Sequence, residues 1–144
     1  MPWSSHQISE LARDLKIPES HFTNCPLPFH EECSNLVSIG PDVFGREQKM
    51  HPHAATKWQS MREAAQEEKV ILLVVSAFRG VEYQKGIIAR KLATGQTIEQ
   101  ILRVSALPGF SEHHTGRLCL ATGVCTVARF CTVAKVATGH AIFR

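Results

Sequence analysis

The sequence predicts an α+β fold for this chain of 144 residues. Apolar residues recur at helical spacing near the N-terminus and again between residues 54 and 68. A continuous apolar run of strand length, VILLVVSAF at residues 70–78, directly follows the second of these segments. With 44% hydrophobic and 20% charged residues, the chain has the composition of one globular domain and enough apolar side chains for a buried core.

The first predicted helix begins after Ser4. Ser4 and Gln7 have the spacing of a capping box, in which each side chain accepts a hydrogen bond from the other residue's backbone N–H. The apolar residues that follow share one helical face: Ile8, Leu11 and Leu15. Residues 21–53 are rich in proline and glycine, which predicts loops and short strands, with NLVSIG at 35–40 the best strand candidate.

The central part of the chain predicts a helix followed by a strand. Between residues 54 and 68, Trp58, Met61 and Ala65 fall at i, i+3 and i+7, so this amphipathic helix should pack its apolar stripe on a sheet. The run at 70–78 has no polar alternation, which is typical of a strand buried on both faces. We therefore expect it to be the central strand.

Two more helices are predicted before the most polar motif of the chain. One covers residues 81–94 and should turn three apolar side chains inward: Ile87, Ile88 and Leu92. Another begins at Thr97, where Gln100 completes a second capping box. The motif SEHHTG at 111–116 then follows a Pro-Gly turn at residues 108–109.

Charge and cysteine content exclude several classes of protein. The net charge of +3 is small and no lysine-arginine run accompanies it, so nucleic acid is not an expected partner. No basic and apolar leader opens the sequence and no apolar segment approaches the length of a membrane span, which predicts a cytoplasmic protein without a transmembrane segment. The five cysteines form no C-x-x-C pair and are expected to be free thiols.

The distribution of acidic residues predicts a boundary near residue 117. All thirteen Asp and Glu residues lie at or before Glu112, whereas residues 117–144 contain four basic residues and no acid. We therefore divide the chain into a domain at 1–117 and an atypical tail at 118–144.

Two blocks of sequence, taken together, resemble the VanY-type D-alanyl-D-alanine carboxypeptidases. These blocks are VVSAFRGVEYQ at 74–84 and PGFSEHHTGR at 108–117, and the likeness extends upstream through SIGPDVFGRE and AATKWQSMREAA. The resemblance implies a Hedgehog/D,D-peptidase-like fold, with helices packed on a small, mostly antiparallel sheet. It also implies a monomeric zinc peptidase acting on peptidoglycan stem peptides or related D-Ala-terminated peptides. D,D- and L,D-specific relatives share these motifs, and a cell-wall substrate points to the periplasm rather than the cytoplasm.

The resemblance also implies a zinc site, which is incomplete in this sequence. In the family the second block reads S-x-H-x-x-G-x-A-x-D, and its His and Asp bind zinc. Ser111, His113 and Gly116 match, so His113 is the implied first zinc ligand, but Leu120 stands at the Asp position. The catalytic Glu and third ligand of the family's closing element have no counterpart, because no acid follows Glu112. Catalytic zinc usually needs three protein ligands and a bound water.

The resemblance assigns roles to three more residues, each with a structural alternative. Arg79 matches the family arginine that would stabilise the oxyanion, whereas an arginine at a strand end can also simply extend along the surface toward solvent. Gln84 and Ser111 are expected to bind substrate, but Gln84 could face solvent and Ser111 could only cap the turn. His113 could likewise be an exposed loop histidine, and His114 is expected to be structural or exposed.

Two histories explain the missing ligands. A shift of reading frame just after codon 117 would replace every later residue at once and leave the upstream blocks intact, and we favour it. Alternatively, the tail has diverged and the scaffold is a non-catalytic binding module. In both cases the predicted protein is a zinc-dependent carboxypeptidase by descent that is inactive as written.

Overall fold

The computed structural model describes residues 3–125, 134–137 and 140–141. The chain forms two compact units. The helical unit consists of Met1–Glu32 and Gly80–His114, and the sheet unit consists of Cys33–Arg79 and Thr115–Arg144. No helix in the described residues is both long and apolar enough to cross a lipid bilayer. The predicted division at residue 117 stays a prediction.

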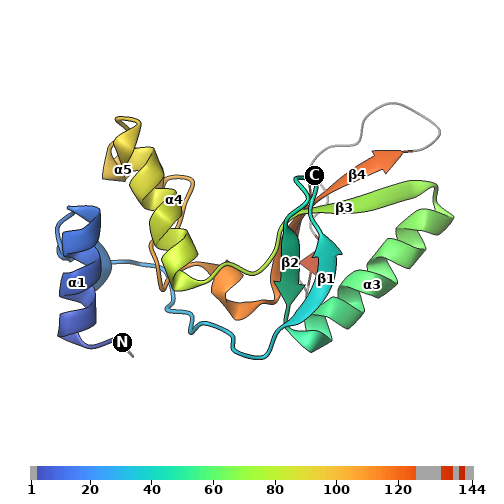
Figure 1. The fold of residues 1–144 in the computed structure, drawn as a ribbon, viewed down its shortest axis with the longest axis horizontal. Coiled ribbons are helices and arrows are strands. Elements are labelled where there is room, and N and C mark those ends of the chain that lie inside the picture. Colours follow the sequence, from blue (N-terminus) through green and yellow to red (C-terminus); the bar gives the residue numbers. More distant parts are fainter. Residues whose placement is uncertain (1–2, 126–133, 138–139, 142–144) are drawn as a thin grey trace. The chain divides into compact units, whose positions relative to one another are not determined.

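Four helices build the helical unit (Figure 1). They are α1 (Ser5–Leu15), α2 (Ser20–Thr23), α4 (Val81–Ala93) and α5 (Ile98–Leu102). Both predicted capping boxes are confirmed: Ser4 caps α1 with Gln7, and Thr97 caps α5 with Gln100. The core of the unit combines the apolar faces of these helices with the segment before the SEHHTG motif: Ile8, Leu11, Ala12, Leu15, Ile17, Phe22, Ile88, Ile98, Ile101, Leu107 and Phe110.

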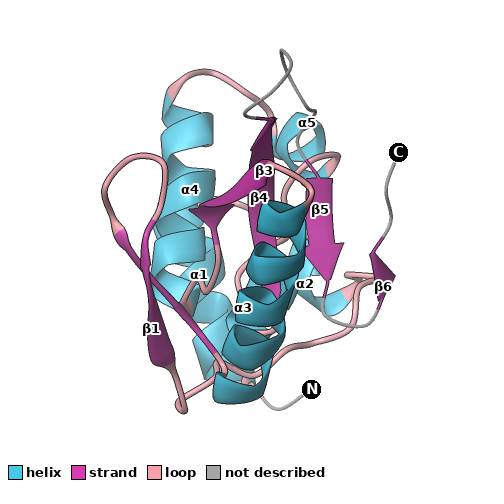
Figure 2. Ribbon diagram, turned by 90° about the vertical axis from the view of Figure 1, so that its right-hand side faces the viewer, coloured by secondary structure: helices cyan, strands magenta, loops and turns pink. Residues whose placement is uncertain are grey.

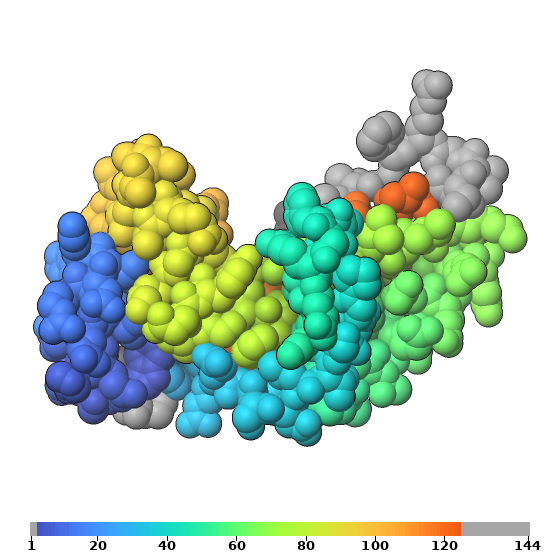
Figure 3. Space-filling view, in the orientation of Figure 1, coloured from blue at the N-terminus to red at the C-terminus, as the bar shows by residue number. Residues whose placement is uncertain are grey.

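The sheet unit contains one long helix, a hairpin and an antiparallel sheet. The hairpin pairs β1 (Val37–Pro41) with β2 (Glu47–Met50). The sheet has the order β3-β4-β5-β6, formed by Val70–Ser76, Leu118–Cys125, Ala134–Ala137 and His140–Ala141. The helix α3 (Pro52–Glu67) lies in front of β3 and β4 in Figure 2. In the space-filling view of Figure 3 the hairpin lies at the surface of this unit, beside the β3 segment.

Helix α3 buries one face of the sheet. Trp58 and Ala54 of α3 are almost completely buried against Val74 of β3 and against Cys119 and Ala121 of β4. The amphipathic stripe predicted for this helix therefore does pack on a sheet. Because Ala121 pairs directly with Val74, the two strands present these small side chains to the same face of the sheet.

The prediction that residues 70–78 form a central strand buried on both faces is wrong. Within the described residues β3 lies at the edge of its sheet, with β4 as its one neighbour. Ile71 and Leu73 are 46% and 38% exposed, because they alternate with the side chains that face α3. A continuous apolar run shows that both faces of a strand are apolar, but it cannot show whether a second layer covers the other face.

Candidate active site

The turn before the SEHHTG motif is fixed by steric contact in the helical unit. Gly109 has a φ of +85°, a conformation that L side chains rarely adopt. A Cβ atom at this position would lie 2.6 Å from the ring of Trp3 and 2.9 Å from the ring of Phe29. The backbone N–H of His30 donates a hydrogen bond to the Gly109 carbonyl at 2.8 Å. Only glycine fits this turn, which sets where the following residues begin.

His114 secures the same turn from the other side. Its side chain is fully buried, and its Nε2 accepts a hydrogen bond from the Gly109 backbone N–H at 3.0 Å. An accepting Nε2 carries no proton, so the neutral ring holds its proton on Nδ1. His114 therefore has a structural position inside the unit, in agreement with the structural alternative and not with the exposed one.

Ser111 and His113 are both buried beside this turn. Ser111 is 5% exposed and His113 is 7% exposed. His113 lies in a short 3₁₀ helix, η1 (Glu112–Thr115), which starts where the His114 backbone N–H bonds to the Ser111 carbonyl at 3.0 Å. The alternative that His113 is an exposed loop histidine is therefore wrong. Its role as a metal ligand stays a prediction.

Gln84 is buried in α4 with one polar atom that lacks a hydrogen-bond partner. The side chain is 2% exposed, and its Nε2 donates to the Ala106 carbonyl at 2.7 Å. Its Oε1 has no partner within the described part of the chain. A buried acceptor without a partner is uncommon, because it loses its hydrogen bonds to water without replacement. Gln84 does not face solvent, and together with Ser111 and His113 it belongs to the helical unit.

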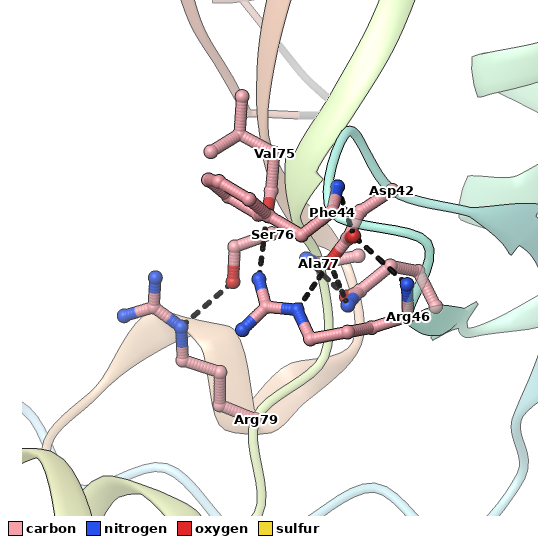
Figure 4. A network of polar contacts seen from close by, with 8 residues as sticks. Asp42, Phe44, Arg46, Val75, Ser76, Ala77 and Arg79 are labelled. Carbon is pink, nitrogen blue, oxygen red and sulfur yellow. Dashed lines mark hydrogen bonds and ion pairs between the residues drawn. The ribbon is translucent and has the colours of Figure 1, made fainter.

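Arg79 belongs to the sheet unit, at the end of the segment that follows β3. Its Nε donates a hydrogen bond to the hydroxyl oxygen of Ser76 at 2.8 Å, as Figure 4 shows. The side chain is half-buried, and its charged group is held by a defined partner. This bond restricts the orientation of the guanidinium, and an ordered guanidinium favours directional binding of a carbonyl or carboxylate oxygen.

Gly116, the last residue of the motif that matches the family, has a steric role in the sheet unit. Its φ is +65°, and a Cβ atom would lie 2.9 Å from Leu36 Cδ2 and 3.0 Å from the backbone nitrogen of His51. That nitrogen donates a hydrogen bond to the Gly116 carbonyl at 2.9 Å. The glycine therefore permits the close approach of two backbone segments.

Leu120 occupies a regular strand position, and its side chain offers no metal ligand. In β4 it pairs with Ser76 of β3, one residue along from the buried Ala121. Burial raises the pKa of the neighbouring Cys119 to about 11, so that thiol is protonated and packed in the core. Within the described residues no cluster of three or more His, Cys, Asp or Glu side chains could hold a metal ion. The described residues therefore do not supply the three protein ligands that a catalytic zinc ion needs.

Sequence reasoning missed two polar residues of the sheet unit, Asp42 and Gln48. Asp42 is 7% exposed and accepts four hydrogen bonds in the turn between β1 and β2. Asp42 lies between Pro41 and Gly45, and this pattern predicts a turn in which the Asp side chain accepts hydrogen bonds from nearby backbone N–H groups. No pattern in the sequence indicates that Gln48 lies beside Ala77.

Comparison with known proteins places these residues in a family. A sequence model described as VanY, D-alanyl-D-alanine carboxypeptidase, matches residues 47–122, which include all four predicted site residues: Arg79, Gln84, Ser111 and His113. No curated protein matches the chain.

Three solved structures of carboxypeptidases are similar to this chain. One is the LdcB LD-carboxypeptidase, whose structure concerns peptidoglycan recognition; it is 27% identical to this chain, with a TM-score of 0.57. The match covers 66% of this chain and 46% of the LdcB chain. A mutant of the D,D-pentapeptidase VanY from a VanB-type vancomycin resistance cassette, in complex with Zn(II), is 24% identical with a TM-score of 0.49, covering 72% and 59%. VanYB in complex with D-Ala-D-Ala is 24% identical with a TM-score of 0.47, covering 68% and 54%.

The chain spans about half the length of these three solved proteins. The predicted α+β class and D,D-peptidase-like fold are confirmed by the helices, the small antiparallel sheets and the likeness to LdcB. The family model covers more than half of the sequence. The chain therefore belongs to the VanY family of D-alanyl-D-alanine carboxypeptidases.

Proposed function

We propose that this chain binds D-Ala-terminated stem peptides of peptidoglycan and does not hydrolyse them. The observation that carries this proposal is the contrast between Leu120, at the position of a zinc ligand, and the family's site residues that this chain retains. Arg79, Gln84, Ser111 and His113 are retained, and the last three are buried in defined positions. Leu120 stands in strand register where the family has a zinc-binding acid, and the described residues do not supply the donor set that zinc needs.

Arg79 of the sheet unit offers a complementary group for a peptide C-terminus. Arg79 carries a permanent positive charge and planar N–H donors, which suit the carbonyl and carboxylate oxygens of such a peptide. Binding requires contacts of this kind but no chemical step, whereas hydrolysis also requires an activated water and a base.

Calorimetric titration with an acyl-D-Ala-D-Ala peptide tests this function. We expect saturable binding by the full chain, no release of D-alanine with or without added zinc, and weaker binding of the acyl-L-Ala-L-Ala control. Arg79→Ala should weaken binding by about tenfold or more, since a hydrogen bond to a charged group contributes about 1.5–3 kcal/mol. Zinc-dependent release of D-alanine by this chain would overturn the proposal, and so would equal affinity for the two peptides.

The frame-shift history is the second candidate, because no acid follows Glu112 in the sequence. On this account the gene encodes an active zinc peptidase in another reading frame after codon 117. Sequencing the source DNA tests it: the alternative frame should supply an Asp at position 120 and a closing Glu-His element. A chain carrying that tail should release D-alanine in a zinc-dependent manner, whereas an alternative frame without these residues would leave the binding function as the explanation.

A further inference from the structure

The backbone around the end of β3, which leads to Arg79, is hydrogen-bonded to the hairpin as well as to β4. The pairing of β3 with β4 shifts register between Val74 and Ser76, which leaves Val75 as a bulge. Ser76 still pairs with Leu120 of β4, and the hairpin supplies further partners: the Val43 N–H donates to the Val74 carbonyl at 2.9 Å, and the Phe78 N–H donates to the Lys49 carbonyl at 3.1 Å. The segment that carries Arg79 therefore takes its position from β2 and from the turn before it, as well as from β4.

Asp42 organises that turn as a buried acceptor. Its Oδ1 accepts from the backbone N–H groups of Phe44 at 2.8 Å and Arg46 at 3.0 Å, and its Oδ2 accepts from Arg46 Nε at 2.8 Å (Figure 4). The other end of the same guanidinium, Nη2, donates to the Val75 carbonyl at 3.4 Å. The carboxylate thus fixes the Arg46 side chain, which reaches from the turn to the bulge of β3.

Gln48 connects this carboxylate to the segment before Arg79. Its Nε2 donates to Asp42 Oδ2 at 2.8 Å, and its Oε1 accepts from the Ala77 backbone N–H at 2.9 Å. A carboxamide has one donor end and one acceptor end, so the acceptor Asp42 determines that the carbonyl end of Gln48 faces Ala77. Ala77 is fully buried, and this bond satisfies its N–H directly after the end of β3.

We propose that Gln48, oriented by Asp42, is a positioning residue for Arg79. Ala77 follows Ser76, whose hydroxyl accepts the Arg79 Nε–H at 2.8 Å, so the peptide held by Gln48 also sets the place of that hydroxyl. The role in peptide binding rests on the function proposed above for Arg79. The geometric part of the inference concerns the Ser76–Arg79 bond and holds whether or not a peptide binds.

The test measures the Arg79 Nε–H in proton–nitrogen correlation spectra of the full chain. In Gln48→Met, which keeps the length of the side chain without its polar ends, we expect this resonance to shift and its hydrogen exchange to accelerate about five- to tenfold, as the loss of one hydrogen bond predicts. Ser76→Ala identifies the signal and should cause the same change. The matched control is Gln59→Met, since Gln59 also donates to a carboxylate, Glu63, at 2.8 Å, but on the exposed face of α3.

A second variant and a second measurement distinguish failure of the positioning role from failure of the proposed binding function. Gln48→Asn retains a carboxamide that is one methylene too short to reach both partners, and it should change the Arg79 signal in the same direction. Both Gln48 variants should also weaken acyl-D-Ala-D-Ala binding, whereas the control should not. An unchanged Arg79 signal in a folded Gln48 variant would overturn the inference, as would unfolding of both variants, because Gln48 would then serve the fold itself. If the unaltered chain binds no peptide, the proposed function fails while the resonance still decides the positioning role.

Discussion

The two units position their candidate residues by different physical means. In the helical unit the turn before Ser111 and His113 is held by close packing, with Trp3 and Phe29 against a glycine of positive φ. In the sheet unit Arg79 depends on polar bonds that run through Asp42, Gln48 and Ser76. An added atom overpacks a close-packed turn, whereas a buried polar network is weakened when one donor or acceptor is lost.

The largest expected effect comes from adding one methyl group to the packed turn. Gly109→Ala should lower the free energy of unfolding by about 2–5 kcal/mol, because the left-handed backbone costs about 1–2 kcal/mol and overpacking adds about 1–3 kcal/mol. Gly95→Ala is the matched control, since Gly95 has a φ of +86° but nothing within 4 Å of its Cβ position. Urea denaturation measures the free energy of unfolding of both variants. Equal losses of stability would show that packing against Trp3 and Phe29 does not restrict the turn.

A second prediction concerns acid and the polar network of the sheet unit. Burial by itself would raise the pKa of Asp42, but hydrogen bonds from the backbone N–H groups of Arg46 and Phe44 and from the Arg46 guanidinium outweigh it, so the pKa lies below its usual value of 3.8. A carboxyl whose pKa is depressed in the folded state stabilises the protein above its unfolded pKa, and this stability is lost as the pH falls through the folded value.

The difference in unfolding free energy between the unaltered chain and Asp42→Asn measures this contribution. We expect the difference to be constant above about pH 5 and to shrink as the pH falls below the usual carboxyl pKa of 3.8. Comparison with a single variant removes the contributions of the other carboxyl groups. A difference that does not change with pH would show that the ionised form of Asp42 is not preferred in the folded protein.

A smaller effect is expected from removing the anchor of Arg79. Ser76→Ala should lower the free energy of unfolding by about 1 kcal/mol, the usual contribution of one hydrogen bond. Ser60→Ala provides the control, because its hydroxyl bonds the Thr56 carbonyl on the exposed face of α3 and should contribute less. Thermal unfolding of the two variants ranks them, and a larger loss in the control would contradict the ranking.

The smallest expected effect is the amount of zinc that the chain binds. The purified chain should retain little zinc after dialysis, and Leu120→Asp should not change this, because two ligands still hold the ion loosely. Elemental analysis of both proteins measures their zinc content after dialysis. Stoichiometric zinc in the unaltered chain, lost in His113→Ala, would show that ligands exist beyond His113.

Local sequence signals determined much of the fold. The capping boxes at Ser4 and Thr97 involve residues only three apart, so they form as soon as the helix does and can be predicted without the rest of the chain. The amphipathic stripe of α3 and the strand character of residues 70–76 were predicted for the same reason. The family blocks likewise indicated Arg79, Gln84, Ser111 and His113, although their roles stay predictions.

Tertiary structure alone decided which surfaces are covered and which polar atoms meet. The sequence could not show that Ile71 and Leu73 face away from α3, because burial depends on a second layer and not on the strand itself. It could not show that Gln48 bridges Asp42 and Ala77, since Gln48 and Ala77 are separated by 29 residues and by the whole of α3. Contacts within a helical turn follow from local spacing, whereas contacts across such a separation arise only when packing closes the intervening chain.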